Sequence, residues 1–270
     1  MRSNDFDLLI KKNRIRGKIF YPPEKFKKNQ GIIILCHGIP GGKKDPEDPG
    51  YAQLAQVLGE EGLQAVTFNF RGAGESAGDF DLRGWAEDLQ GVKDYVVSLD
   101  AGSSPVVLFG FSAGAAVAVY ACAQDSKEIA GLILCGCPAD FDSILKERGI
   151  DQYLNHCRQI GIIKTPGFPF DRSAWIESFH LLRPENWVGS LMLKPTLIIH
   201  GDQDNVVPVE HAYRLYEKAL DPKELIIIKK GGHRLRLNEA AMNAARNWLN
   251  TTLHSKADRG EDDQNVKSET

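Results

Sequence analysis

No stretch of this sequence stays apolar for long enough to cross a membrane. The longest apolar runs, such as residues 31–35 and 225–228, have the length of a β-strand. The first seven residues lack the apolar segment of a secretory signal peptide. The five cysteines of the 270-residue chain lie mostly inside apolar runs, which is typical of reduced thiols. We therefore expect a cytoplasmic protein with no membrane span.

The sequence also lacks an excess of either charge. Its 33 lysines and arginines nearly balance 36 aspartates and glutamates, which gives a formal net charge of −3. Proteins that bind nucleic acid or anionic membranes carry a basic surplus, so neither is an expected partner. The 42% of hydrophobic residues is enough for one large core. The expected partner is a small-molecule substrate, and the oligomeric state stays open, a homo-oligomer included.

Short apolar runs alternate with helical patterns through most of the chain. Strands are predicted at 6–10, 14–21, 31–36, 65–70, 106–109, 129–135, 195–200 and 224–228. Helices are predicted around 51–58, 82–96, 113–123, 209–216 and 241–248. This alternation predicts an α/β fold with a mostly parallel, doubly wound sheet of about eight strands, in which the first two strands form an antiparallel edge. Such sheets bind ligands at the carboxyl ends of their strands.

The alternation breaks between residues 138 and 194. This segment is too long for a simple connection and too rich in aromatic residues for disorder. We interpret it as a helical cap, or lid, inserted into a core made of residues 1–137 and 195–254. Helices packed away from the site are the alternative. Residues 255–270 are charged and nearly free of large apolar side chains, so we expect a disordered tail.

The pattern Gly110-Phe-Ser-Ala-Gly114 stands between a predicted buried strand and an Ala-rich helix. A serine at such a turn adopts a strained backbone conformation that exposes its Oγ at the end of the strand. Glycines two residues to either side leave room for this turn. The pentapeptide alone is weak, but the strand and helix around it favour Ser112 as a nucleophile.

A serine hydroxyl needs a general base, and the base needs a group that orients it. His233 follows the last predicted strand in a glycine-rich loop, and Asp204 follows the strand before it. The order Ser, Asp, His is that of G-x-S-x-G enzymes. Asp202 is a competitor for the acid. Asp140 and Asp142, after the sixth strand, are a further alternative.

With these motifs in this order, the chain resembles the α/β-hydrolase superfamily over residues 5–253, nearest to its capped esterase, lipase-like and serine aminopeptidase-like branch. The resemblance implies an oxyanion hole made by the backbone N–H groups of Ile39 and Ala113. It also implies support from five further positions, which are His37, Gly38, Arg71, Gly110 and Gly114. Relatives often carry Asp two residues before this Arg, where this sequence has Asn69. Because that Asp is not part of the triad, the change to Asn69 leaves the predicted triad intact, but it makes the subfamily harder to assign.

Other candidate sites have plainer explanations. His37 is expected to support the oxyanion loop rather than act as a base, and His200 to be a satisfied core histidine. The pairs Cys135/Cys137 and Cys36/His37 lack a second ligand pair at zinc spacing, so no metal is expected. The glycine-rich loops lack the lysine and threonine pattern of a phosphate-binding loop, and no cofactor is expected.

We therefore predict a serine hydrolase that cleaves small or medium carboxylic esters through an acyl-enzyme. A peptidase or amidase is the alternative within enzymes, because the same triad serves both reactions. A non-catalytic ligand-binding protein is the alternative outside enzymes. The sequence does not identify the substrate.

Overall fold

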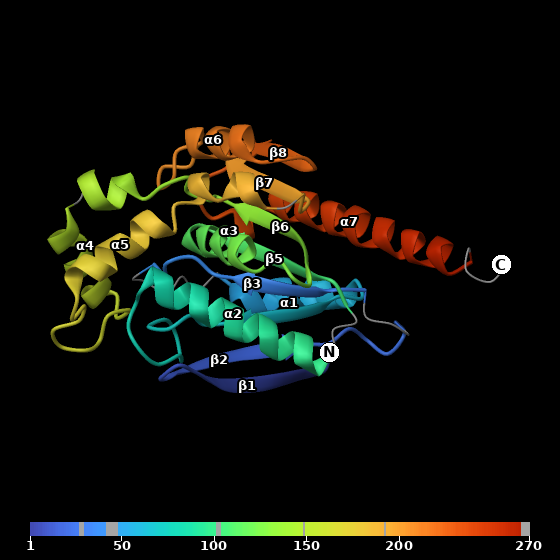
Figure 1. Cartoon of the computed structure of the whole chain (residues 1–270), viewed down its shortest axis with the longest axis horizontal. Helices are drawn as coiled ribbons and strands as arrows, with labels where there is room; N and C mark the ends of the chain where they lie inside the picture. The colour runs from blue at the N-terminus through green and yellow to red at the C-terminus, as the bar shows by residue number, and fades with distance from the viewer. Residues whose placement is uncertain (27–29, 42–47, 101–103, 148, 192, 266–270) are drawn as a thin grey trace.

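The computed structural model describes residues 1–26, 30–41, 48–100, 104–147, 149–191 and 193–265. Eight strands form one sheet in the order β1-β2-β4-β3-β5-β6-β7-β8 (Figure 1). They are β1 (Ser3–Ile10), β2 (Asn13–Phe20), β3 (Ile32–Cys36), β4 (Gln64–Phe68), β5 (Val106–Phe111), β6 (Ile129–Cys135), β7 (Thr196–Gly201) and β8 (Lys223–Ile228). The pairs β1–β2 and β2–β4 are antiparallel, and the other pairs of neighbouring strands are parallel. The predicted fold class is confirmed.

Helices cover both faces of the sheet (Figure 1). In β3, Ile32 and Ile34 pack into one hydrophobic cluster, whereas Ile33 and Leu35 pack into the other. This split follows from the alternation of side chains along a strand. Helices α2 (Leu82–Leu99), α3 (Ala113–Gln124) and α6 (Glu210–Lys218) contribute to the first cluster, and α1 (Gly50–Glu60) and α7 (Glu239–Asn265) to the second.

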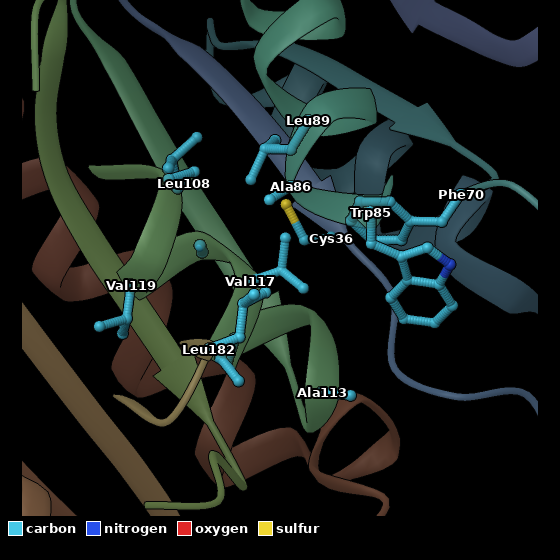
Figure 2. Packing of buried hydrophobic residues seen from close by; sticks show 14 of the residues in the cluster. Cys36, Phe70, Trp85, Ala86, Leu89, Leu108, Ala113, Val117, Val119 and Leu182 are labelled. Atoms are coloured by element: carbon cyan, nitrogen blue, oxygen red, sulfur yellow. The ribbon is translucent and has the colours of Figure 1, made fainter. Parts of the chain in front are cut away.

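Helix α3 is buried nearly all round, as its Ala-rich sequence predicts. From Ala113 to Val119 every residue is buried, and small side chains let the helix approach the sheet and α2 closely. Figure 2 shows Val117 near Cys36 of β3 and Ala86 of α2. The helix that follows Ser112 is therefore fixed by packing on several sides.

The segment between β6 and β7 is helical throughout its regular parts. It contains a π-helical turn η1 (Ser143–Glu147), α4 (Ile150–Gln159), α5 (Arg172–Leu181) and two 3₁₀ turns, η2 (Pro184–Asn186) and η3 (Val188–Ser190). Figure 1 shows α4 and α5 together at one end of the molecule. Trp175 and Phe179 are buried in the same cluster as α2 and α3. These two aromatic residues of the insertion therefore pack as core, whereas Phe170 is exposed.

The carboxyl-terminal prediction needs a correction. Helix α7 continues to Asn265, so residues 255–265 are helical where we expected a disordered tail. The segment has only one each of Ala, Lys, Arg, Glu and Gln, beside three aspartates and Gly260, but it extends a helix already anchored by Trp248. Lack of apolar residues predicts that a segment does not pack, but it does not prevent an anchored helix from continuing. Residues 266–270 of the expected tail lie outside the described residues.

Candidate active site

The three predicted triad residues follow neighbouring strands. Ser112 comes directly after β5, Asp204 lies three residues beyond β7, and His233 lies five residues beyond β8. Strands β5, β6, β7 and β8 are consecutive in the sheet and parallel, so all three residues lie at one edge. The end of β6 lies between them. The Ser112 N–H donates to the carbonyl of Cys135 over 2.8 Å, and Gly136 lies beside the His233 and Asp204 side chains.

Ser112 adopts the strained conformation that its motif predicts, with φ of 52° and ψ of −126°. Few residues with a side chain occupy this region, and such strain clusters at functional sites. Its carbonyl accepts a 2.9 Å hydrogen bond from the Ala115 N–H, which starts α3. A Cβ at Gly114 would overlap the carbonyl oxygens of Cys36 and His37, and one at Gly110 would overlap the backbone of Ala115. Both glycines permit the close approach of strand and helix.

His233 is oriented by Asp204. Its Nδ1 lies 2.7 Å from Asp204 Oδ2, so Nδ1 carries a proton and Nε2 can accept one. Asp204 Oδ1 accepts hydrogen bonds of 2.9 Å from the N–H groups of Val206 and Val207. Burial alone would raise the pKa of Asp204, but the hydrogen bonds from His200, His233 and the backbone lower it well below its usual range. The acid therefore stays ionised.

Asp202, the alternative candidate for the acid, contacts the backbone and side chains of the loop after β8. Its Oδ1 accepts a 2.6 Å hydrogen bond from the Lys230 N–H, and its other oxygen lies 3.6 Å from the Lys229 ammonium. Asp140 pairs with Arg214 over 2.7 Å, and Asp142 pairs with Lys146 and Arg183. The geometry therefore brings Asp204, and none of these three, to His233.

The loop after β3 lies against Ser112. A Cβ at Gly38 would come within 2.9 Å of the Ser112 Cβ, so glycine permits this approach. His37 Nε2 accepts a 3.0 Å hydrogen bond from the Phe70 N–H, and His37 Nδ1 lies 2.6 Å from the Gly38 carbonyl oxygen. Nδ1 therefore donates and the imidazole is neutral. Burial lowers the pKa of His37 to about 4, which the hydrogen bond to Gly38 only partly opposes. The expected supporting role of His37 fits these contacts.

Ser112 and His233 open into one cavity of about 2100 Å³. His37, Gly38, Ile39 and Ala113 also line it, which places the loop of the proposed oxyanion hole beside the nucleophile. Asp204, Gly110 and Gly114 lie behind this surface. Large cavities that hold a few polar groups are the usual sites of small ligands.

Arg71 does not line the cavity. Its guanidinium and its backbone N–H bind the fully buried carboxylate of Asp88 on α2, with a shortest distance of 2.7 Å. Its carbonyl accepts from the indole N–H of Trp85. Arg71 thus fixes the loop after β4 to α2. The sequence did not identify Asp88 as its partner, although a carboxylate on the apolar face of a predicted helix was a signal.

His200 differs from the satisfied core histidine that we expected. It is fully buried, and its Nε2 lies 2.8 Å from the Val207 carbonyl oxygen and 3.4 Å from Asp204 Oδ2. Its Nδ1 has no hydrogen-bonding partner among the described residues. The sequence placed this histidine at a strand end and did not show its contact with the acid.

The described residues contain neither an exposed thiol nor a cluster of possible metal ligands. All five cysteines are free and buried, and burial raises the pKa of the Cys36 and Cys135 thiols. Within the described ranges, no three His, Cys, Asp or Glu side chains are grouped as metal ligands. Each described helix is too short or too polar to span a membrane.

Comparison with known proteins agrees with the fold. Residues 27–151, which include β3, β5 and Ser112, match the hydrolase family described as serine aminopeptidase S33. An α/β serine hydrolase homologue from Coxiella burnetii is 25% identical, with a TM-score of 0.61 over 91% of this chain and 95% of its own. The chain has the α/β-hydrolase fold. A thermostable carboxyl esterase from Bacillus coagulans superposes with a TM-score of 0.70 over 94% of this chain and 99% of its own, at 18% identity.

The curated relatives that this chain matches are longer proteins. The uncharacterized protein YfhR of Escherichia coli K12 is 29% identical over 203 residues, which is 74% of this chain and 62% of YfhR. The chain thus spans about three-fifths of the length of this curated relative. The resemblance to the α/β-hydrolase superfamily that the motifs indicated is confirmed.

Proposed function

We propose that this α/β hydrolase is a serine hydrolase that cleaves uncharged carboxylic esters of small or medium size. Ser112 is the nucleophile, His233 the general base and acid, and Asp204 the residue that orients His233. The observation that carries the proposal is the 2.7 Å contact between His233 Nδ1 and Asp204 Oδ2, at the cavity where the strained Ser112 lies. This contact leaves His233 Nε2 as the proton acceptor on the cavity side.

The reaction proceeds through an acyl-enzyme. His233 Nε2 takes the Ser112 hydroxyl proton as Oγ bonds to the ester carbonyl carbon, and the carbonyl oxygen becomes an oxyanion. Backbone N–H groups of Ile39 and Ala113 stabilise that charge. The carbon–oxygen bond to the alcohol then breaks, and His233 gives its proton to the departing oxygen. Water attacks the acyl-enzyme by the same route and releases the acid and free Ser112.

The charges around the cavity favour an uncharged substrate. Among the described residues that line it, each acidic side chain lies within ion-pair distance of a lysine or arginine. Asp48, for example, pairs with Arg236 over 2.5 Å, and Asp140 pairs with Arg214 over 2.7 Å. Neither carboxylate is left to bind the α-amine of a peptide. This pairing favours ester hydrolysis over aminopeptidase activity, even though the matching family carries the aminopeptidase description.

Hydrolysis by matched variants tests the proposal. We expect the protein to turn over p-nitrophenyl acyl esters and to leave aminoacyl anilides intact. Ser112→Ala and His233→Ala should lower kcat by roughly 10⁴-fold or more, and Asp204→Asn by somewhat less. Ser143→Ala removes another serine that lines the cavity, and it should retain the rate of the unaltered protein.

Three results would contradict the proposal. Cleavage of anilides in preference to esters would move the protein to the peptidases. Ester hydrolysis that survives in Ser112→Ala would remove Ser112 from its role. No turnover of either class, with all variants folded, would support a non-catalytic ligand-binding protein.

A further inference from the structure

A second imidazole lies beside the acid of the proposed triad. His200, in β7, is fully buried, and its Nε2 is 3.4 Å from Asp204 Oδ2, the oxygen that also binds His233. The same Nε2 is 2.8 Å from the carbonyl oxygen of Val207. Asp204 therefore lies between two histidines, one facing the cavity and one inside the core.

The neighbours of His200 Nε2 determine where its proton is. Both the Val207 carbonyl and the Asp204 carboxylate are hydrogen-bond acceptors, so Nε2 carries the proton and donates. Nδ1 has no partner among the described residues, and protonating it would bury an unpaired N–H group. His200 is thus a neutral Nε2–H tautomer that directs its only N–H toward the turn holding Asp204.

The backbone of Val207 forms hydrogen bonds with both Asp204 and His200. Its N–H donates to Asp204 Oδ1 over 2.9 Å, and its carbonyl accepts from His200 over 2.8 Å. The side chain of Asp204 is completely buried, so solvent cannot replace a lost donor. Without the His200 N–H, the Val207 carbonyl would lose its donor and Asp204 Oδ2 would keep His233 alone.

We propose that His200 is a positioning residue for the reaction, holding the turn from Asp204 to Val207 and stabilising the Asp204 carboxylate through its Nε2–H. The inference rests on the proposed function, because it acts through Asp204 on His233. This role differs from a packing role because the effect of His200 on the reaction depends on its N–H donor and not on the shape of its side chain.

A pair of variants with nearly the same shape separates donor from shape. His200→Gln retains an N–H near the position of Nε2, whereas His200→Met has similar length and no donor. We expect His200→Met to lower kcat for ester hydrolysis by about 10- to 100-fold, the usual effect of losing a hydrogen bond to a charged group, with KM little changed. His200→Gln should recover most of that loss. His180→Met, at an exposed position on α5, is the matched control and should retain full activity.

The inference would be overturned if kcat fell equally in His200→Gln and His200→Met, or if His200→Met kept full activity. Either result would leave the proposed function intact, provided that the unaltered protein hydrolyses esters. A nitrogen NMR spectrum of the imidazoles in the unaltered protein is a second test, independent of variants and of turnover. It should show His200 as the neutral Nε2–H tautomer at neutral pH. An Nδ1–H or doubly protonated ring would refute the assignment, whereas failure of the protein to cleave any ester would refute the proposed function.

Discussion

At the scale of single residues, His37 shows how the fold removes a histidine from acid–base chemistry. The imidazole is buried between two backbone partners, accepting from the Phe70 N–H and donating to the Gly38 carbonyl. Neither partner favours the charged form enough to offset burial. His233, in the same cavity, has a carboxylate at Nδ1 instead. The difference between a supporting histidine and a proposed base is thus set by what each Nδ1 contacts.

The buried state of His37 predicts how stability depends on pH. Burial lowers the pKa of His37 from 6.5 to about 4. Between these values the unfolded chain binds a proton that the folded protein does not, so stability falls as pH falls. Relative to a pH well above 6.5, the loss at pH 5 is about 2 kcal/mol, at 1.36 kcal/mol per pH unit. Urea unfolding at several pH values measures it.

His37→Gln isolates the contribution of this group. Glutamine can also donate to Gly38 and accept from Phe70, but it does not titrate. The variant should lose less stability than the unaltered protein on acidification, by about 2 kcal/mol. His180→Gln, at an exposed position, should follow the unaltered protein. Parallel pH dependence of the unaltered protein and His37→Gln would show that His37 is protonated in the folded state.

At the scale of elements, the contact of α3 with the end of β3 fixes the site. Gly114 lies in the first turn of α3, against the carbonyls of Cys36 and His37. The same β3 loop continues into Gly38, which touches Ser112. Ser112 and the loop of the proposed oxyanion hole are therefore held together where one helix meets one strand.

Gly114→Ala tests this contact. In an ordinary helix the change from glycine to alanine is stabilising by about 1 kcal/mol. Here the added Cβ overlaps two carbonyl oxygens, so we expect a loss of about 1–3 kcal/mol in the free energy of unfolding and a fall in ester hydrolysis. Gly59→Ala, on α1, is the control, since its Cβ meets only the flexible end of Met1 and should cost nothing. Equal stability of the two variants would contradict the tight contact.

Local patterns predicted the elements better than the contacts between them. Apolar runs predicted the central strands β3, β5, β6 and β7 to within a few residues, because a strand buried on both faces has to be apolar along its length. The order of Ser112, Asp204 and His233 indicated the site. Nothing local showed that His200 contacts Asp204, because that pairing depends on how the turn after β7 folds back. The helix over residues 255–265 was missed because its stability comes from the anchored part of α7.

At the scale of the whole molecule, the insertion between β6 and β7 is joined to the core on the cavity side. Asp79 accepts hydrogen bonds from the backbone N–H groups of Lys164 and Thr165, over 2.6 and 2.9 Å. The indole of Trp175 donates to the Phe80 carbonyl over 2.9 Å. Tyr153 and His156 of α4 line the cavity. We therefore propose that the part of the insertion that caps the cavity is α4 with the residues just after β6. Helix α5 packs into the core instead.

Reaction with a fluorophosphonate, followed by mass mapping of the labelled peptide, tests the central claim most directly. The reagent bonds only to a serine whose proton is removed by a nearby base, so it reports the triad without assuming a substrate. We predict one label, on Ser112, that is absent from Ser112→Ala and formed much more slowly in His233→Ala. Labelling of another serine, or a Ser112 that stays unlabelled in a protein that hydrolyses esters, would contradict the account.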